Sequence, residues 1–267
     1  MNTNAKNPIG IFDSGVGGLT VANAIYRALP NENIIYYGDT VHLPYGDKSP
    51  EAIQGYSKEI VDFLLTQHCK VIVIACNSAS SHAYQTLKKH IGDKAILVNV
   101  IDPVVDYVAK QNFKQVGIIG TRATILSNIY NDKIKAKAPK HKTVGKATPL
   151  LASFVEEGFF RKRALTEMLL EEYLADEDLQ NIDALILACT HYPLLKDDID
   201  AYYRQKVTLI DSTAIVANYV EQILKDNSLL NEAGNLLDFY VSDYTASFEK
   251  MVNIFFGSPV NLELKRL

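Results

Sequence analysis

The sequence lacks the features that would place the chain in a membrane, outside the cell or on nucleic acid. No stretch of its 267 residues is apolar and long enough to cross a bilayer, and the first residues lack the apolar run of a secretory signal. Lysine and arginine number 27 against 31 aspartate and glutamate, so the formal charge of −4 offers phosphate backbones no net attraction. We therefore expect a cytoplasmic protein with neither a membrane nor a nucleic acid as partner.

Cysteine is also scarce, with only Cys69, Cys76 and Cys189 present. An odd count in a chain without an export signal argues against a disulfide framework, so each is expected to be a thiol. Cys69 and Cys76 lie further apart than paired zinc ligands do, and the six histidines are scattered. We expect no metal site.

What the sequence does contain is an alternation of short aliphatic runs with longer helix-like segments. Runs such as VIVIA and ALILA are apolar without alternation, which is typical of parallel strands covered by helices on both faces. This pattern predicts an α/β fold. The predicted strands are centred near Ile11, Ile35, Val73, Leu97, Ile118, Ile186 and Leu209.

Two pieces of the sequence are repeated approximately. KVIVIACNSAS, with Cys76, resembles DALILACTHYP, with Cys189, and IGIFDSG, with Asp13, resembles VGIIGTR, with Gly120. Short matches can arise by chance in buried strands, but both offsets are about 110 positions, which favours duplicated halves. We predict two pseudo-symmetric domains, each a mostly parallel sheet flanked by helices. They comprise residues 1–98 with 211–267, and residues 99–210.

Cys76 and Cys189 each end a predicted strand, where open parallel sheets bind ligands. A free cysteine is often only a small buried apolar side chain. Polar residues, however, follow both Cys76 and Cys189. A helix N-terminus lowers the pKa of a thiol from about 8.5, and a thiol with a lowered pKa can act as a base. Cys69 has no such context and is interpreted as structural. The polar residues are Asn77, Ser78 and Ser80 after the first cysteine, and Thr190 and His191 after the second.

The glycine-rich turn DSGVGG invites comparison with nucleotide-binding loops. A dinucleotide fingerprint would need glycine where Thr20 stands, and a phosphate loop would need Gly-Lys-Ser/Thr. Asp39, after a second strand, could still bind a ribose, so nucleotide binding stays an alternative. The better interpretation is that the glycines let amides approach a small carboxylate, while Asp13 and Ser14 supply a carboxyl and a hydroxyl group. Asp13 could instead be a helix N-cap.

Three further positions have both a functional and an ordinary interpretation. Tyr45 and Gly46 belong to a proline-containing loop that either lines a pocket or makes a turn. His191 is either a catalytic group beside Cys189 or a satisfied polar residue. Glu156 and Glu157 are a pair of acids of the kind that usually faces solvent.

The motifs DSGVGGLTV, DTVHLPYG, ACNSAS, GTRATI, PLLASFVEEG and CTHYPLL, in this order, resemble the glutamate racemases of the aspartate/glutamate racemase superfamily. The resemblance runs from Pro8 to about Gly257. It implies an isomerase with its active site in the cleft between two domains, no cofactor, L-glutamate and D-glutamate as substrates, and a role in peptidoglycan biosynthesis. A homodimer is also implied. Some members respond to a cell-wall precursor through extra N-terminal sequence, and since few residues precede Ile9 we expect no such extension.

Position by position, the resemblance implies that Cys76 and Cys189 are the paired proton donor and acceptor, with Cys76 serving D-glutamate and Cys189 L-glutamate. Asp13 would assist the first thiol, and His191 with Glu156 the second. Ser78 stands where Thr is more usual, and Ser153-Phe154 replaces a more usual Pro-Leu, which weakens the placement of Glu156. The implied substrate contacts are Asp13, Ser14, Tyr45, Gly46, Asn77, Ser78, Thr121, Thr190 and His191.

Two thiols suit the inversion of a carbon acid, because hydrogen leaves one face of Cα and arrives at the other. Each sulfur would stand about 3 to 3.5 Å from that carbon, so the two would be roughly 7 Å apart. Three rivals remain at this point. They are a related racemase or decarboxylase acting on aspartate, hydantoins or malonates, a nonenzymatic nucleotide or amino-acid binding module, and a thiol hydrolase using Cys189 with His191.

Overall fold

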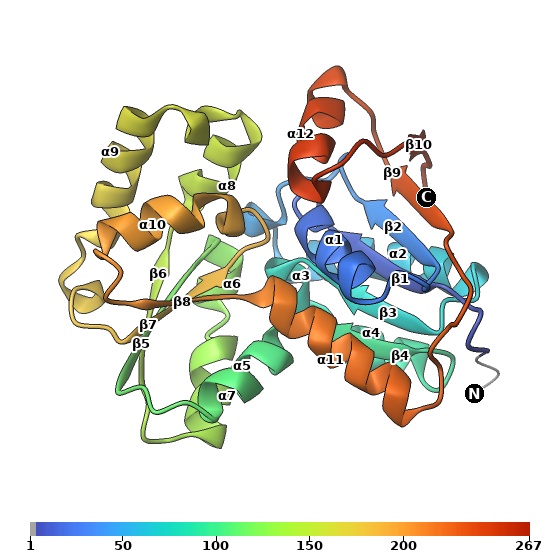
Figure 1. Cartoon of the computed structure of the whole chain (residues 1–267), viewed down its shortest axis with the longest axis horizontal. Helices are drawn as coiled ribbons and strands as arrows, with labels where there is room; N and C mark the ends of the chain where they lie inside the picture. Colours follow the sequence, from blue (N-terminus) through green and yellow to red (C-terminus); the bar gives the residue numbers. More distant parts are fainter. Residues whose placement is uncertain (1–3) are drawn as a thin grey trace.

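The computed structural model describes residues 4–267, which form two parallel sheets, each flanked by helices (Figure 1). The first sheet has the strand order β10-β9-β2-β1-β3-β4 and the second the order β6-β5-β7-β8, and every neighbouring pair is parallel. The predicted α/β class is therefore confirmed. Among residues 4–267, no helix has both the length and the apolar character needed to cross a membrane.

Strands β1, β2, β3 and β7 are buried along their whole length, as their unbroken apolar runs predict. The first sheet contains β1 (Ile9–Asp13), β2 (Ile34–Gly38), β3 (Val71–Ile74), β4 (Ile96–Asn99), β9 (Leu237–Val241) and β10 (Leu262–Leu264). The helices around it are α1 (Leu19–Ala28), α2 (Pro50–Thr66), α3 (Asn77–His82), α4 (Tyr84–Ile91), α11 (Ser212–Asp226) and α12 (Ala246–Phe256), with a 3₁₀ turn at Tyr45–Asp47.

The second sheet contains β5 (Gln115–Gly120), β6 (Lys142–Ala147), β7 (Ala184–Ala188) and β8 (Thr208–Asp211). Its helices are α5 (Ile101–Ala109), α6 (Arg122–Leu126), α7 (Ile129–Lys137), α8 (Pro149–Glu156), α9 (Arg163–Leu174) and α10 (Lys196–Tyr202), with 3₁₀ turns at Phe159–Arg161, Glu177–Leu179 and Tyr192–Leu195. Three strands were not predicted from the sequence: β6, β9 and β10.

The two sheets share one topology. The order β2-β1-β3-β4 of the first is repeated as β6-β5-β7-β8 in the second, so β1 corresponds to β5, and β3 corresponds to β7. These are the pairs of strands in which the sequence repeat was found, and the predicted duplication is thus confirmed as a repeated topology. The C-terminal segment adds β9 and β10 to the first sheet only.

The chain crosses between the sheets twice, through α5 after β4 and through α11 after β8. Helix α11 packs against α1 and also against α5, which packs against α7 (Figure 1). The predicted domain boundaries at 98/99 and 210/211 fall at the last residues of β4 and β8, namely Asn99 and Asp211. We keep these boundaries as a proposal.

Candidate active site

Loops that follow β1, β2, β3, β5 and β7 surround one cavity of about 30 Å³. That space holds a water molecule but is too small for an amino acid, so a substrate must enter through an opening of the structure. All the predicted site residues except Asp13 line it. The lining consists of Ser14, Leu43, Pro44, Tyr45, Gly46, Cys76, Asn77, Ser78, Thr121, Ala152, Glu156, Ala188, Cys189, Thr190 and His191.

Cys76 is the N-cap residue of α3, where its Sγ accepts a hydrogen bond from the amide of Ala79 at 3.5 Å. Its thiol lies 3.7 Å from the hydroxyl of Ser14. Burial raises the pKa of Cys76 to about 12, and the charge of Asp13 adds to this, while the Ala79 amide and Ser14 act in the opposite direction. The prediction that the helix N-terminus lowers this pKa is therefore wrong for the closed site, because loss of solvent outweighs one amide. Cys76 rests as a thiol.

Asp13 lies at the end of β1 and is fully buried. Its Oδ2 accepts from the amide of Gly15 at 3.1 Å, whereas Oδ1 has no partner within bonding distance among the described residues. Burial raises the pKa of Asp13, and the charge of His191 and the amides of Gly18 and Gly15 offset part of that rise. Asp13 is not the N-cap of α1, which is Gly18. It is instead a buried carboxyl group close enough to Cys76 to influence its proton.

Cys189 follows β7 and is succeeded by the 3₁₀ turn Tyr192–Leu195, so the expectation of an α-helix N-terminus at this second thiol is wrong. The group beside the sulfur of Cys189 is the ring of His191 rather than the amides of a helix N-terminus. The Sγ of Cys189 lies 3.5 Å from Nδ1 of His191, and Nε2 of His191 lies 2.8 Å from Oε1 of Glu156. Glu157, by contrast, is the exposed C-cap of α8.

His191 is buried between a sulfur and a carboxylate. Burial alone would lower the pKa of this histidine, but Cys189 and Glu156 outweigh burial and hold the pKa well above its ordinary value. The ring is therefore an imidazolium that donates through Nε2 to Glu156 and through Nδ1 toward Cys189. Phe255 of α12 packs edge-on against this ring, with the ring centroids 5.2 Å apart.

Hydrogen bonds between the two halves of the chain close the cavity. The hydroxyl oxygens of Ser78 and Thr121 are 2.8 Å apart, and the Tyr130 hydroxyl donates to Oδ1 of Asn77 at 2.8 Å. Nδ2 of Asn77 is buried without a hydrogen-bond partner among the described residues. This amide group can donate to a bound carboxylate, and a buried donor of this kind is costly to leave unpaired.

Two glycines permit the close approach of the halves. A Cβ atom on Gly17 would lie 2.4 Å from Cε1 of His191 and 2.6 Å from Oγ1 of Thr190, and one on Gly46 would lie 2.8 Å from Cβ of Thr121. Gly17 was missed as a functional position, because the glycines of its turn were interpreted only as a cradle for a carboxylate.

Four residues that line the cavity were not predicted from the sequence and carry no reactive group: Leu43, Pro44, Ala152 and Ala188. Leu43 and Pro44 directly precede Tyr45 in the HLPYG motif, and Ala152 lies one helical turn before Glu156 on α8. The sequence could have indicated these residues only through their closeness in the chain to a predicted site residue.

Cys69 is buried outside the cavity, with 1% of its surface exposed, and its Sγ would lie 2.8 Å from a Cβ atom on Gly10. Its burial in the apolar core agrees with a structural role. Within residues 4–267, no group of three or more histidine, cysteine, aspartate or glutamate side chains is arranged to hold a metal ion. Asp39 hydrogen bonds to Tyr45, His42 and Ser242, which leaves its carboxylate oxygens engaged within the protein rather than free for a ribose.

Known proteins resemble this chain along nearly its whole length. A family model described as Asp/Glu/Hydantoin racemase matches residues 11–220. The glutamate racemase of Geobacter metallireducens is 41% identical over 256 residues, covering 94% of this chain and 93% of that protein. The glutamate racemase of Francisella tularensis, solved in complex with D-glutamate, is 38% identical with a TM-score of 0.90 and covers 98% of both chains. The isoform RacE1 from Bacillus anthracis is 33% identical with a TM-score of 0.93 and covers 99% of both.

Proposed function

Because this chain belongs to the glutamate racemase family, we propose that it interconverts L-glutamate and D-glutamate with Cys76 and Cys189 as its two acid–base groups. The observation that carries the proposal is that both thiols are unbridged and line one cavity, each beside its own ionisable partner. A binding module would not need two such thiols. A thiol hydrolase would use Cys189 with His191 but would leave Cys76 without a role.

The surroundings of the two thiols suggest which thiol acts first on each enantiomer. Burial raises the pKa of Cys76, which therefore carries a proton to donate, and the His191 imidazolium lies beside Cys189. In our proposal Cys189 removes the α-proton of L-glutamate, and Cys76 donates its proton to the opposite face of the carbanion to give D-glutamate. The reverse reaction starts with the proton on Cys189 and the thiolate at Cys76.

The carbanion formed at Cα must be stabilised by polar groups that are already oriented toward it, so that they need not reorganise during the reaction. Donors fixed around the α-carboxylate in a small cavity provide this, because their interactions are strong where bulk water is excluded. We assign Nδ2 of Asn77, which has no partner among the described residues, and the hydroxyl groups of Ser14, Thr121 and Thr190 to this task. Tyr45 and Gly46 complete the proposed substrate site on the other side.

We further propose that the product D-glutamate supplies peptidoglycan synthesis in the cytoplasm and that the enzyme acts as a homodimer. These parts of the proposal rest on family membership alone.

The proposed substrate is tested by comparing glutamate with aspartate, which is shorter by one methylene. We expect kcat/KM for glutamate to exceed that for aspartate by about tenfold or more, because a site built for the longer acid leaves the shorter one poorly positioned. Circular dichroism of each enantiomer with purified enzyme, no added cofactor and excess EDTA measures this directly. Comparable turnover of the two acids would contradict the assignment, and loss of activity in EDTA would contradict a metal-free mechanism.

The His191–Glu156 contact predicts a shift in pH dependence. Glu156 raises the pKa of His191, so Glu156→Gln should let the imidazolium lose its proton at a lower pH. The alkaline limb of kcat/KM for L-glutamate should therefore move to lower pH in this variant. Glu157→Gln is the matched control, since Glu157 is exposed, and its profile should equal that of the wild type. Equal profiles for all three proteins would exclude the proposed role of Glu156.

A further inference from the structure

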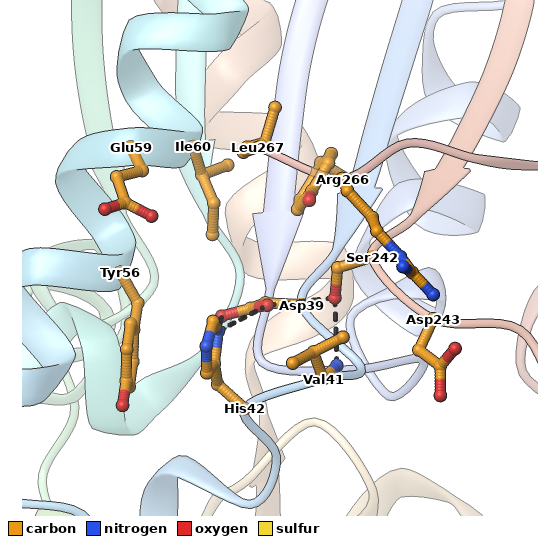
Figure 2. Close-up of a pocket in the computed structure, with 11 residues that line it drawn as sticks. Asp39, Val41, His42, Tyr56, Glu59, Ile60, Ser242, Asp243, Arg266 and Leu267 are labelled. Atoms are coloured by element: carbon orange, nitrogen blue, oxygen red, sulfur yellow. Dashed lines mark hydrogen bonds and ion pairs between the residues drawn. The ribbon is translucent and has the colours of Figure 1, made fainter.

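A second and larger cavity, of about 460 Å³, lies beside the loop that leads from β2 to the active site (Figure 2). It is formed by that loop, helix α2, the residues after β9 and the last residues of the sequence. Its volume lies within the range of about 300 to 1,000 Å³ that is usual for small-molecule sites, whereas the active-site cavity measures about 30 Å³. The proposed mechanism makes no use of this space.

The wall of this second cavity combines a flat aromatic surface with negative charge. The rings of His42 and Tyr56 are stacked, with centroids 3.9 Å apart and an interplanar angle of 7° (Figure 2). Asp39, Glu59 and Asp243 contribute carboxylates, against the single guanidinium of Arg266. Neither Glu59 nor Asp243 forms an ion pair within the described chain. Such a wall repels phosphates and attracts organic cations, which also interact well with aromatic faces.

The same wall is connected to the active site by hydrogen bonds. Oδ2 of Asp39 accepts from the Tyr45 hydroxyl at 2.6 Å and lies 2.9 Å from Nδ1 of His42, while Oδ1 accepts from Ser242 at 3.0 Å. Asp39 is only 3% exposed, so its few partners determine its position. Tyr45 lines the active-site cavity, and an occupant that displaces His42 or Ser242 would therefore alter the support of Tyr45.

We propose that this second cavity binds a small organic cation with an ammonium group and a flat apolar body, and that its occupancy changes the affinity of the active site for glutamate through His42, Asp39 and Tyr45. The ammonium group pairs with Glu59, and the apolar body packs against the His42–Tyr56 stack. The coupling rests on the proposed function, whereas the binding of the cation does not.

Three probes of similar shape and different charge test the binding: phenethylamine, neutral 2-phenylethanol and anionic 3-phenylpropionate. Calorimetric titration of the wild type should detect phenethylamine alone. Glu59→Gln should weaken its binding about two- to fivefold, as expected for loss of one partly solvated ion pair. Val41→Trp should abolish binding by filling the cavity from an exposed position. Glu51→Gln, in the first turn of the same helix and outside the cavity, should bind like the wild type.

The coupling is tested by titrating glutamate with and without saturating phenethylamine. We expect the glutamate Kd to change at least twofold, and the Kd of phenethylamine to change by the same factor when glutamate is saturating. Equal binding of 2-phenylethanol, no binding of phenethylamine, or unchanged binding by Val41→Trp would overturn the cation site. Normal phenethylamine binding with an unchanged glutamate Kd would overturn the coupling. Failure of the proposed function would show separately, as an absence of racemisation without any probe.

Discussion

Replacing either Cys76 or Cys189 with alanine is expected to lower the rate of glutamate racemisation by about a thousandfold in both directions. Each thiol serves one face of Cα, and forward and reverse reactions share the same transition states, so loss of one acid–base group stops both. Binding of glutamate should largely remain, because the carboxylate-binding groups are other side chains. Rates from circular dichroism and affinities from calorimetry measure the two effects separately.

Cys69→Ala is the matched control for the two thiol substitutions. Cys69 is buried like the other cysteines but lies outside the active-site cavity. This variant should lose some stability through the missing sulfur and keep a rate close to that of the wild type. Near-normal racemisation by Cys76→Ala or Cys189→Ala, or an equal loss of rate in all three variants, would contradict the assignment.

Gly17→Ala is expected to lower kcat/KM by about a hundredfold while leaving the fold intact. Its Cβ atom would lie 2.4 Å from His191 and 2.6 Å from Thr190, so the two halves of the chain could not close fully. A displacement of catalytic groups by about 1 Å is enough for a loss of this size. Steady-state kinetics should show the loss, and far-ultraviolet circular dichroism should match that of the wild type.

Gly55→Ala provides the control for the added methyl group. Gly55 lies inside α2, and a Cβ atom there would meet nothing within 4 Å. Alanine should raise the free energy of unfolding by about 0.5 to 1 kcal/mol, because glycine disfavours a helix interior, and it should leave the rate unchanged. Wild-type kcat/KM in Gly17→Ala would show that the tight contact with His191 is not needed for catalysis.

The sequence predicted the fully buried strands well and missed β6, β9 and β10, of which β6 and β10 have weak apolar signals. β3 and β7 are short apolar runs covered on both faces, so their composition alone predicts strands. β6 has the sequence KTVGKA and contains no fully buried residue. It lies at the edge of the second sheet, and β10 lies at the edge of the first, so each has a neighbouring strand on one side only. An edge strand does not need a continuous apolar run, and its sequence resembles that of a loop.

The site was predictable where reactive side chains follow strands, as at Cys76, Asn77, Cys189 and His191. Features of the site that depend on how one half of the chain packs against the other could not be predicted from the sequence. The contact of Gly17 with His191 joins segments far apart in the sequence, and no local pattern encodes it. The raised pKa of Cys76 has the same origin, since it follows from the depth of burial in the closed structure.

The central claim, that two thiols serve opposite faces of Cα, is tested most directly by racemisation in heavy water, with deuterium at Cα followed by NMR. Each turnover should place solvent deuterium in the product, because the donating thiol exchanges its proton with solvent, while unreacted substrate initially keeps its hydrogen. Product formed mostly without solvent deuterium would mean that a single base carries the same hydrogen from one face to the other, and would contradict the account.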